Sequence, residues 1–274
     1  MFSPIRRIAE ALTPKTITIG TTLIFAGVGG AYALRLRDSL RQTNPRHIQS
    51  SVAVSESLVD SSTVRRLVNP RSHVSKGDSH SIILSMCSRK NVASEKDLLS
   101  TFVTGFFSGP VFLPESIALT LFPLSKVSYD ELTPTTDQKV IWSAKQLSDT
   151  QLPPISSILW GTFQVAEIEH SDNQASESTG SRAVIVFGDN KGSFAGCHRF
   201  SVKRLDTSTD NEADEIKFRL SLECLVCDPT SSKPKESEFL HKVHNNYSYF
   251  LFRDAVAHTK SRYNSLIESS HEED

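Results

Sequence analysis

The sequence predicts an α+β fold in which an antiparallel sheet packs against a long C-terminal helix, preceded by one N-terminal transmembrane helix. Three observations predict this arrangement. Residues 16–34 form an apolar run of nineteen residues without a charge, strand-like runs fill the region 140–227, and residues 237–267 carry a wide apolar arc at helical spacing. The chain therefore divides into a membrane anchor and one folded domain.

The anchor is predicted from length and flanking charge. A helix over residues 16–34 would be about 28 Å long, which matches the ~30 Å core of a bilayer. Residues 1–15 place apolar side chains at helical spacing beside Arg6 and Arg7, as in a weak mitochondrial targeting segment. We expect a single-pass protein of a mitochondrial membrane. The alternatives are the endoplasmic reticulum, a cleaved secretory signal and a buried soluble helix. Small residues such as Ala26 and Gly30 would allow association between spanning helices.

Overall charge argues against a nucleic-acid partner. Thirty Lys and Arg residues oppose thirty-one Asp and Glu residues, whereas a nucleic-acid binder normally carries a basic excess. Four cysteines are too few and too unevenly spaced for a disulfide framework, so a reducing compartment is expected for the domain.

Residues 35–78 are predicted to be a linker, since residues 42–78 are rich in Ser, Val and Arg without a sustained period, with one short helix near residues 57–67. The folded domain is expected over residues 79–267. It begins with a strand at 81–88, and Ser94 with Asp97 three residues later predicts a capped helix start.

The remaining elements follow from periodicity and breakers. The helix opened by Ser94 ends near Pro110, and a second short helix covers 114–122. Apolar and polar residues alternate in 216–222, which is typical of a sheet exposed to water on one face. Short polar loops between consecutive strands favour an antiparallel meander. Strands are predicted at 140–146, 158–169, 182–188, 197–205 and 215–227. After the last helix, residues 268–274 form a polar acidic tail that is expected to be disordered.

This element order resembles the helix-grip fold of the START and pollen-allergen superfamily over residues 80–265. Segments 101–107, 197–202 and 244–254 are also similar to an uncharacterised branch of such proteins. The resemblance implies a curved sheet that wraps around the last helix and leaves an apolar cavity. It further implies binding or short-range transfer of a lipid, a sterol or a quinone. The alternative is an interior filled by aromatic side chains such as Phe106, Phe107 and Trp160.

Six residues are candidates for contacting such a ligand. A guanidinium beside a carboxylate could orient an anionic ligand group, and aromatic residues of the last helix could line its apolar part. The alternative is that the strand residues lie on a solvated face of the sheet and the aromatic residues pack in the core without contacting a ligand. The candidates are His198, Arg199, Glu223, Tyr247, Tyr249 and Phe252.

Cys224 and Cys227, followed by His241 and His244, resemble a zinc pattern at first sight. The histidines are one residue too close, and strand residues three apart point to opposite faces, so we expect no metal and no cofactor. No catalytic motif is complete. Two other functions stay open: an enzyme on this or a hot-dog-like scaffold, of thioesterase or cyclase type, and a membrane-tethered scaffold for a protein partner.

Overall fold

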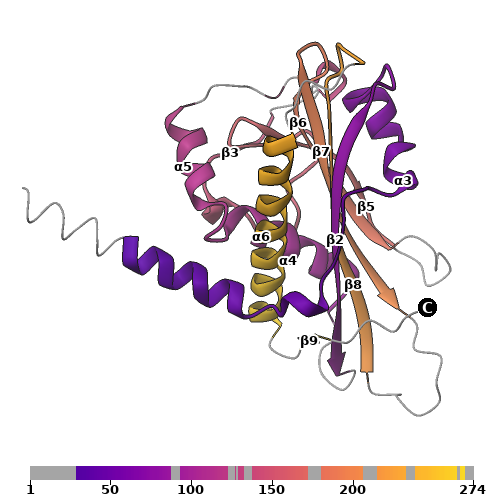
Figure 1. The fold of residues 1–274 in the computed structure, drawn as a ribbon. Coiled ribbons are helices and arrows are strands. Elements are labelled where there is room, and N and C mark those ends of the chain that lie inside the picture. The colour runs from indigo at the N-terminus through magenta and orange to yellow at the C-terminus, as the bar shows by residue number, and fades with distance from the viewer. Residues whose placement is uncertain are drawn as a thin grey trace, which may run out of the picture.

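One mixed β-sheet forms the body of the protein, with the longer helices across one face and the short helical segment of residues 56–68 against the other (Figure 1). The computed structural model describes residues 29–87, 93–122, 127, 129–132, 138–171, 180–205, 215–232, 238–263 and 266–268. Most of the predicted anchor, 16–34, and the tail beyond residue 268 lie outside this set. None of the helices that are described is by itself long and apolar enough to cross a membrane.

The sheet has nine strands in the order β1-β2-β8-β7-β6-β5-β4-β3, with β9 added beside β2. The first long strand therefore pairs with the last one, and every ladder is antiparallel except β3 with β4. The strands are β1 (Gln49–Ser51), β2 (Ser75–Cys87), β3 (Val140–Ile141), β4 (Ile158–Leu159), β5 (Phe163–Glu169), β6 (Ser181–Asp189), β7 (Phe194–Leu205), β8 (Glu215–Cys227) and β9 (Leu266–Glu268).

The helices confirm the predicted order of elements. They comprise a helix over residues 29–41, then α3 (Glu56–Val59), η2 (Val64–Val68, a π-helical turn), α4 (Glu95–Ser108), α5 (Leu113–Leu121) and α6 (Glu238–Arg262), with short 3-10 turns η1 (Pro45–His47), η3 (Asp130–Leu132) and η4 (Ala144–Gln146). Ser94 and Asp97 form the expected capping box at the start of α4. The last helix ends at Arg262, before the predicted 267.

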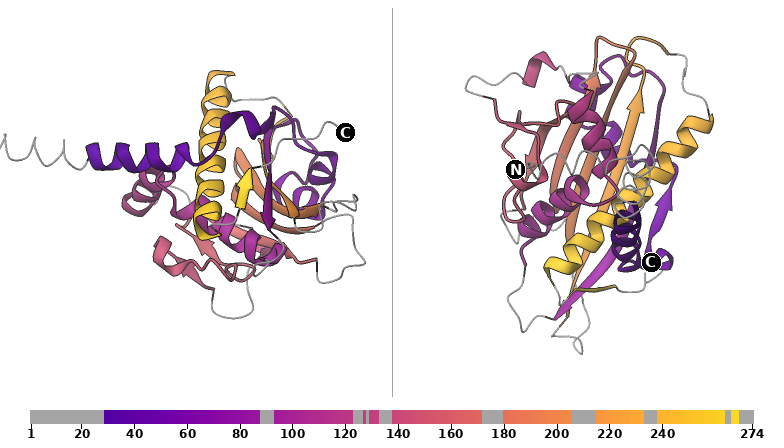
Figure 2. Two further views of the ribbon diagram at one scale, coloured as in Figure 1. Left: turned by 90° about the horizontal axis from the view of Figure 1, so that it is seen from below. Right: turned by 90° about the vertical axis from the view of Figure 1, so that its left-hand side faces the viewer.

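α4 lies against the sheet and beside α6 (Figure 2). Its aromatic side chains pack against rings of both. Phe106 and Phe200 have ring centroids 5.1 Å apart, and Phe102 lies between Phe200 and Phe252 at 5.6 and 5.8 Å. These rings are almost fully buried. The part of the sheet–α6 interior that the structure describes is therefore packed with side chains, as the filled-interior alternative predicted.

Two predicted strands are interrupted. Trp160 and Gly161 both adopt positive φ, at 48° and 70°, and this turn divides the predicted strand 158–169 into β4 and β5. Of the predicted strand 140–146, only β3 is extended, because a capping box from Ser143 starts the 3-10 turn η4.

Residues 35–78 are packed on the domain instead of forming an extended linker. Leu58, Val64, Leu67 and Val68 are buried against the face of the sheet opposite α6. The apolar residues in this segment are too irregularly spaced to show a period, which is why the sequence did not predict their burial.

The helix of residues 29–41 is fixed to α6 by partly buried polar contacts. The Arg253 guanidinium donates to the carbonyl of Leu40 at 2.5 Å, and the Asp254 carboxylate accepts from the Ser39 hydroxyl and from the Val111 N–H. In Figure 1 this helix, in indigo, crosses α6 and runs away from the sheet at its N-terminal end. The predicted anchor thus leads directly into an element that is docked on the domain.

Replacing a ring of this core tests whether α4 holds the fold together. Phe106→Ala should lower the free energy of unfolding by about 3–5 kcal/mol, because it removes a buried ring and leaves a cavity. Phe122→Ala, at a ring that is 62% exposed, should cost about 0.5 kcal/mol or less. Urea unfolding of both variants measures the difference, and similar losses would contradict the packing described here.

Candidate functional site

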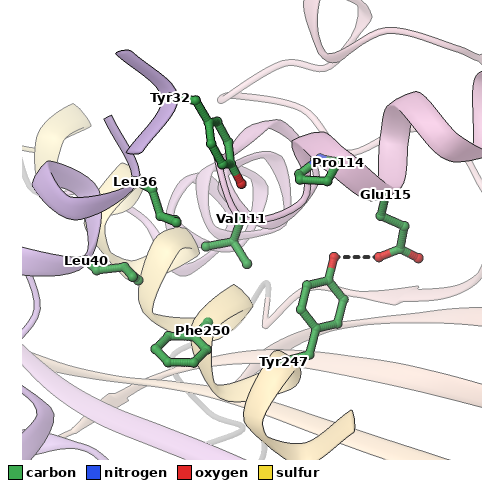
Figure 3. A pocket seen from close by; sticks show the side chains of 8 residues that line it. All are labelled: Tyr32, Leu36, Leu40, Val111, Pro114, Glu115, Tyr247 and Phe250. Atoms are coloured by element: carbon green, nitrogen blue, oxygen red, sulfur yellow. Dashed lines mark hydrogen bonds between the residues drawn. The ribbon is translucent and has the colours of Figure 1, made fainter. Parts of the chain in front are cut away.

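An apolar pocket lies on the side of α6 that faces away from the sheet (Figure 3). Its volume is about 560 Å³, within the range of ligand sites. We name it the outer pocket. Three elements form it: the helix of residues 29–41, the α4–α5 corner and α6. Its lining residues are Tyr32, Leu36, Leu40, Val111, Pro114, Glu115, Tyr247 and Phe250.

Helical spacing explains one wall of the outer pocket. Tyr32, Leu36 and Leu40 lie four residues apart, so a single face of the helix presents all three. The Tyr32 hydroxyl donates to the carbonyl of Pro110 at 3.0 Å, which ties this helix to the α4–α5 corner. Because this hydroxyl is engaged, the helix presents to the pocket only the ring of Tyr32 and the aliphatic side chains of Leu36 and Leu40.

One polar pair lies in this apolar setting. The Tyr247 hydroxyl donates to Oε2 of Glu115 over 2.6 Å. Burial raises the pKa of Glu115 above its ordinary value, and the hydrogen bond from Tyr247 partly offsets this. Burial also raises the pKa of Tyr247, so its phenol stays protonated and donates. The pair could orient a polar group at the end of an apolar ligand.

The six predicted site residues do not meet in one place. Tyr247 alone lines the outer pocket. Arg199 and Glu223 face the opposite side of the sheet, since the side chains of a strand alternate between its faces. Tyr249 and Phe252 lie around His80 where the sheet meets α6, and His198 lies on the same face of the sheet among phenylalanine rings.

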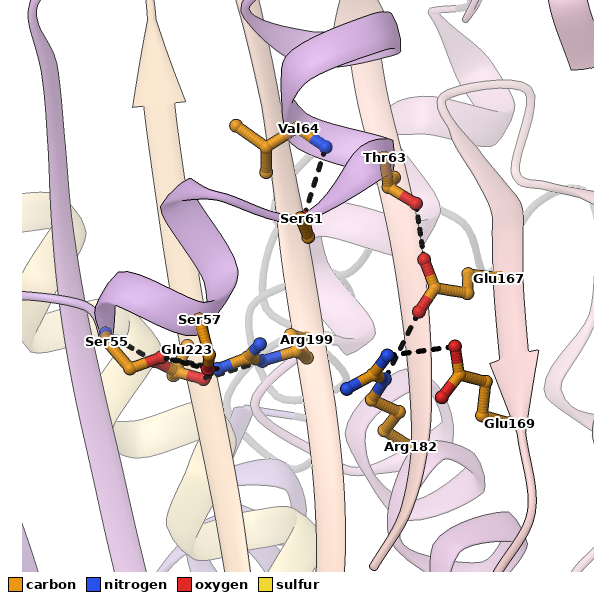
Figure 4. A network of polar contacts seen from close by, with 10 residues as sticks. All are labelled: Ser55, Ser57, Ser61, Thr63, Val64, Glu167, Glu169, Arg182, Arg199 and Glu223. Carbon is orange, nitrogen blue, oxygen red and sulfur yellow. Dashed lines mark hydrogen bonds and ion pairs between the residues drawn. The ribbon is translucent and has the colours of Figure 1, made fainter. Parts of the chain in front are cut away.

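Arg199 and Glu223 act as a clamp on the segment that contains α3 (Figure 4). Arg199 Nε donates to Glu223 Oε2 over 2.7 Å, and its terminal nitrogen donates to the hydroxyls of Ser55 and Ser57. The Ser55 N–H donates to the other carboxylate oxygen over 2.7 Å. A serine-rich groove of about 500 Å³ adjoins this clamp. Because the guanidinium is already engaged, a structural role explains the pair better than ligand binding does.

A second clamp continues this network. Glu167 accepts from the Thr63 hydroxyl at 2.5 Å and from Arg182 Nε at 3.2 Å, and Arg182 also donates to Glu169. The two clamps hold the start of α3 and the start of η2, which explains why residues without a period stay on the sheet.

His198 is enclosed by rings, with Phe187 at 5.0 Å and Phe106 at 5.2 Å between centroids. Desolvation, and to a lesser degree His244, lowers its pKa to about 3, so its ring is neutral at physiological pH. Phe252 is fully buried, and Tyr249 lies beneath the Arg253 guanidinium at 5.6 Å. These residues do not line the outer pocket.

Of the four residues in the zinc-like pattern, the structure brings Cys224 and His244 together and places Cys227 on the opposite face of the sheet. Cys227 faces away from α6, and its thiol donates to the carbonyl of Val68 at 3.5 Å. Cys224 faces α6, and its sulfur lies 3.2 Å from Nε2 of His244. The side chain of His241 lies outside the described set. The expected divergence of the two cysteines is confirmed, but the approach of Cys224 to His244 was not expected.

Sequence reasoning missed most of the outer pocket. Tyr32 falls inside the predicted anchor, while Leu36 and Leu40 fall in the predicted linker, so their four-residue spacing spans the boundary between two predicted segments. Glu115 follows Pro114 at the start of a short helix, where an acidic residue is ordinary.

Comparison of the chain with models of protein families, with curated proteins and with solved structures finds no significant match. Its function is therefore inferred from the arrangement of its own residues.

The clamp generates a stability prediction. Glu223→Gln and Arg199→Met should each lower the free energy of unfolding by about 3–5 kcal/mol, because each leaves the other charge buried without its partner. The double variant should cost less than the sum of the two, since contacting residues are not additive. Denaturant unfolding of the three variants completes this double-mutant cycle. If the two single losses of unfolding free energy simply add in the double variant, Arg199 and Glu223 are not coupled.

Glu115 generates a pH prediction. Because its pKa is raised in the folded state, the stability it contributes is present below its ordinary value of 4.5 and is lost as pH rises through the folded pKa. Glu115→Gln keeps an acceptor for Tyr247 and removes this titration. Relative to the variant, the natural chain should lose stability as pH rises above about 4.5. Unfolding free energies across that range test the sign, and a relative gain would contradict the assignment.

Proposed function

We propose that this protein binds an apolar chain molecule, such as a lipid, a sterol or a quinone, in the outer pocket while its N-terminal segment anchors it to a membrane. One observation carries the proposal. The helix of residues 29–41, which overlaps the end of the predicted anchor, forms one wall of the pocket through Tyr32, Leu36 and Leu40. The segment next to the proposed membrane span is therefore part of the binding site. Binding needs no chemistry: the apolar walls desolvate the ligand, and Tyr247 with Glu115 orients its polar end.

Exposed arginines and exposed apolar side chains near the pocket support the proposal that this surface faces a membrane. Arg35, Arg37 and Arg41 are exposed on the helix of residues 29–41. Arginines near an anionic leaflet each contribute about 1 kcal/mol of attraction. Helix α5 exposes Ile117 and Leu121 by 50% and 65%. Figure 1 places α5 and the 29–41 helix on the same side of α6. A bilayer on that side would lie beside the mouth of the pocket.

The resemblance to the helix-grip fold is kept as part of this proposal. Two helices follow the first long strand, antiparallel strands come next, and the long helix α6 follows them, with only the short strand β9 after it. Here α4 occupies the interior, so we place the ligand on the other side of α6. In this arrangement the helix of residues 29–41 supplies the outer wall, and a mitochondrial membrane supplies the ligand.

A photoactivatable fatty acid tests the proposal on the full chain in vesicles. The probe should label peptides that contain Tyr32 to Leu40, Val111 to Glu115 and Tyr247 to Phe250, identified by mass spectrometry. Leu36→Trp should reduce that labelling at least tenfold, because an indole fills part of about 560 Å³ of apolar space.

Ala33→Trp is the matched control. Ala33 is exposed on the same helix and lies outside the pocket lining, so its variant should be labelled like the natural chain. Labelling confined to residues 16–28, or equal labelling of both tryptophan variants, would contradict the outer pocket as a ligand site. The second result would favour the protein-interaction scaffold, with the exposed face of α5 as its first candidate surface.

A further inference from the structure

Five polar side chains converge where the sheet meets α6. His198, Cys224 and Asp78 are cross-strand neighbours on β7, β8 and β2, so their side chains form one row on the face toward α6. His244 approaches this row from α6, and His80 lies two residues beyond Asp78 on the same face. None of these residues lines the outer pocket, so this cluster is a separate site.

Three ligand-type atoms in the cluster point to a common centre. Nε2 of His244 lies 3.2 Å from Sγ of Cys224 and 3.8 Å from Oδ1 of Asp78, and all three atoms fall within 4.8 Å of one another. Ligands around a tetrahedral zinc ion are separated by about 3.4–3.6 Å, given Zn–S of about 2.3 Å and Zn–N or Zn–O of about 2.0–2.2 Å. The observed separations lie on either side of this range.

The geometry argues against a nucleophile relay. In a Cys-His-Asp relay the carboxylate holds one imidazole nitrogen while the nucleophile bonds the other. Here Asp78 and Cys224 both approach the same nitrogen of His244. That convergence suits a shared ion and does not suit transfer of a proton along a chain of groups.

Unsatisfied buried atoms are the independent observation. Asp78 is 1% exposed, yet neither carboxylate oxygen makes a hydrogen bond with any residue that the structure describes. Oδ2 lies 2.9 Å from Nε2 of His80, but the two atoms are not aligned for a hydrogen bond. Nδ1 of His198 is likewise buried without a partner among those residues. A buried carboxylate left in this state is costly, and coordination of a cation would satisfy it.

We propose that Asp78, Cys224 and His244 bind a zinc-like divalent metal ion and leave a fourth coordination position open. A thiolate, an imidazole and a carboxylate together select a borderline-soft ion over Mg²⁺ or Ca²⁺. Nε2 of His80 lies 2.9 Å from the second oxygen of Asp78, in the position of an outer-shell neighbour. The side chain of His244 is 29% exposed, which gives the ion an entry path. Three protein ligands with an open position are typical of catalytic rather than structural zinc.

Cobalt(II) titration of the full chain in detergent tests this site. The natural chain should bind one equivalent, with a thiolate-to-cobalt charge-transfer band that zinc displaces. Cys224→Ser should abolish the band and weaken zinc binding at least about 100-fold, since loss of an outer-shell partner alone costs 10–100-fold. Cys227→Ser, on the opposite face of the same strand, should leave the band and the zinc affinity unchanged.

X-ray absorption of the zinc-loaded natural chain makes the test independent of how the variants fold. One sulfur among nitrogen and oxygen neighbours is expected. A shell without sulfur, no cobalt band at stoichiometric metal, or Mg²⁺ binding tighter than Zn²⁺ would overturn the proposal. So would an equal loss of zinc affinity in Cys224→Ser and Cys227→Ser.

Discussion

The packing of α4 between the sheet and α6 is the constraint on which the rest of the structure depends. Its rings interlock with Phe200 of β7 and Phe252 of α6, so they fix how far the last helix stands from the strands. Since protein interiors are close-packed, these rings fill the part of the sheet–α6 interior that they occupy among the described residues. The side of α6 away from the sheet is then left to be covered by the helix of residues 29–41, and the outer pocket lies between them.

Strand alternation distributes the polar residues of the sheet between two faces with different roles. Arg199 and Glu223 point away from α6 and fasten the α3 segment through ion-paired hydrogen bonds. Their neighbours on β7 and β8, His198 and Cys224, point toward α6 and join Asp78 and His244. A shift of one residue in register would exchange these two sets, so the long β2–β8–β7 ladder determines both the clamp and the proposed metal site.

Sequence patterns predicted the regular elements well and the site poorly. The capping box at Ser94, the order of the elements and the antiparallel pairing of the long strands follow from local chemistry and alternation, and all are present. The burial of Leu58 and Leu67 depends on clamps formed by residues more than a hundred positions away, which no local pattern reveals. Likewise Asp78 and His244 meet only because the first and last long strands pair beneath α6.

Native mass spectrometry of the full chain, released from membranes in mild detergent, tests the central claim most directly. A stoichiometric apolar molecule should be bound to the natural chain and to Ala33→Trp, and should be absent from Leu36→Trp. A folded natural chain that carries no such molecule, or a ligand that persists in Leu36→Trp, would contradict a binding site in the outer pocket.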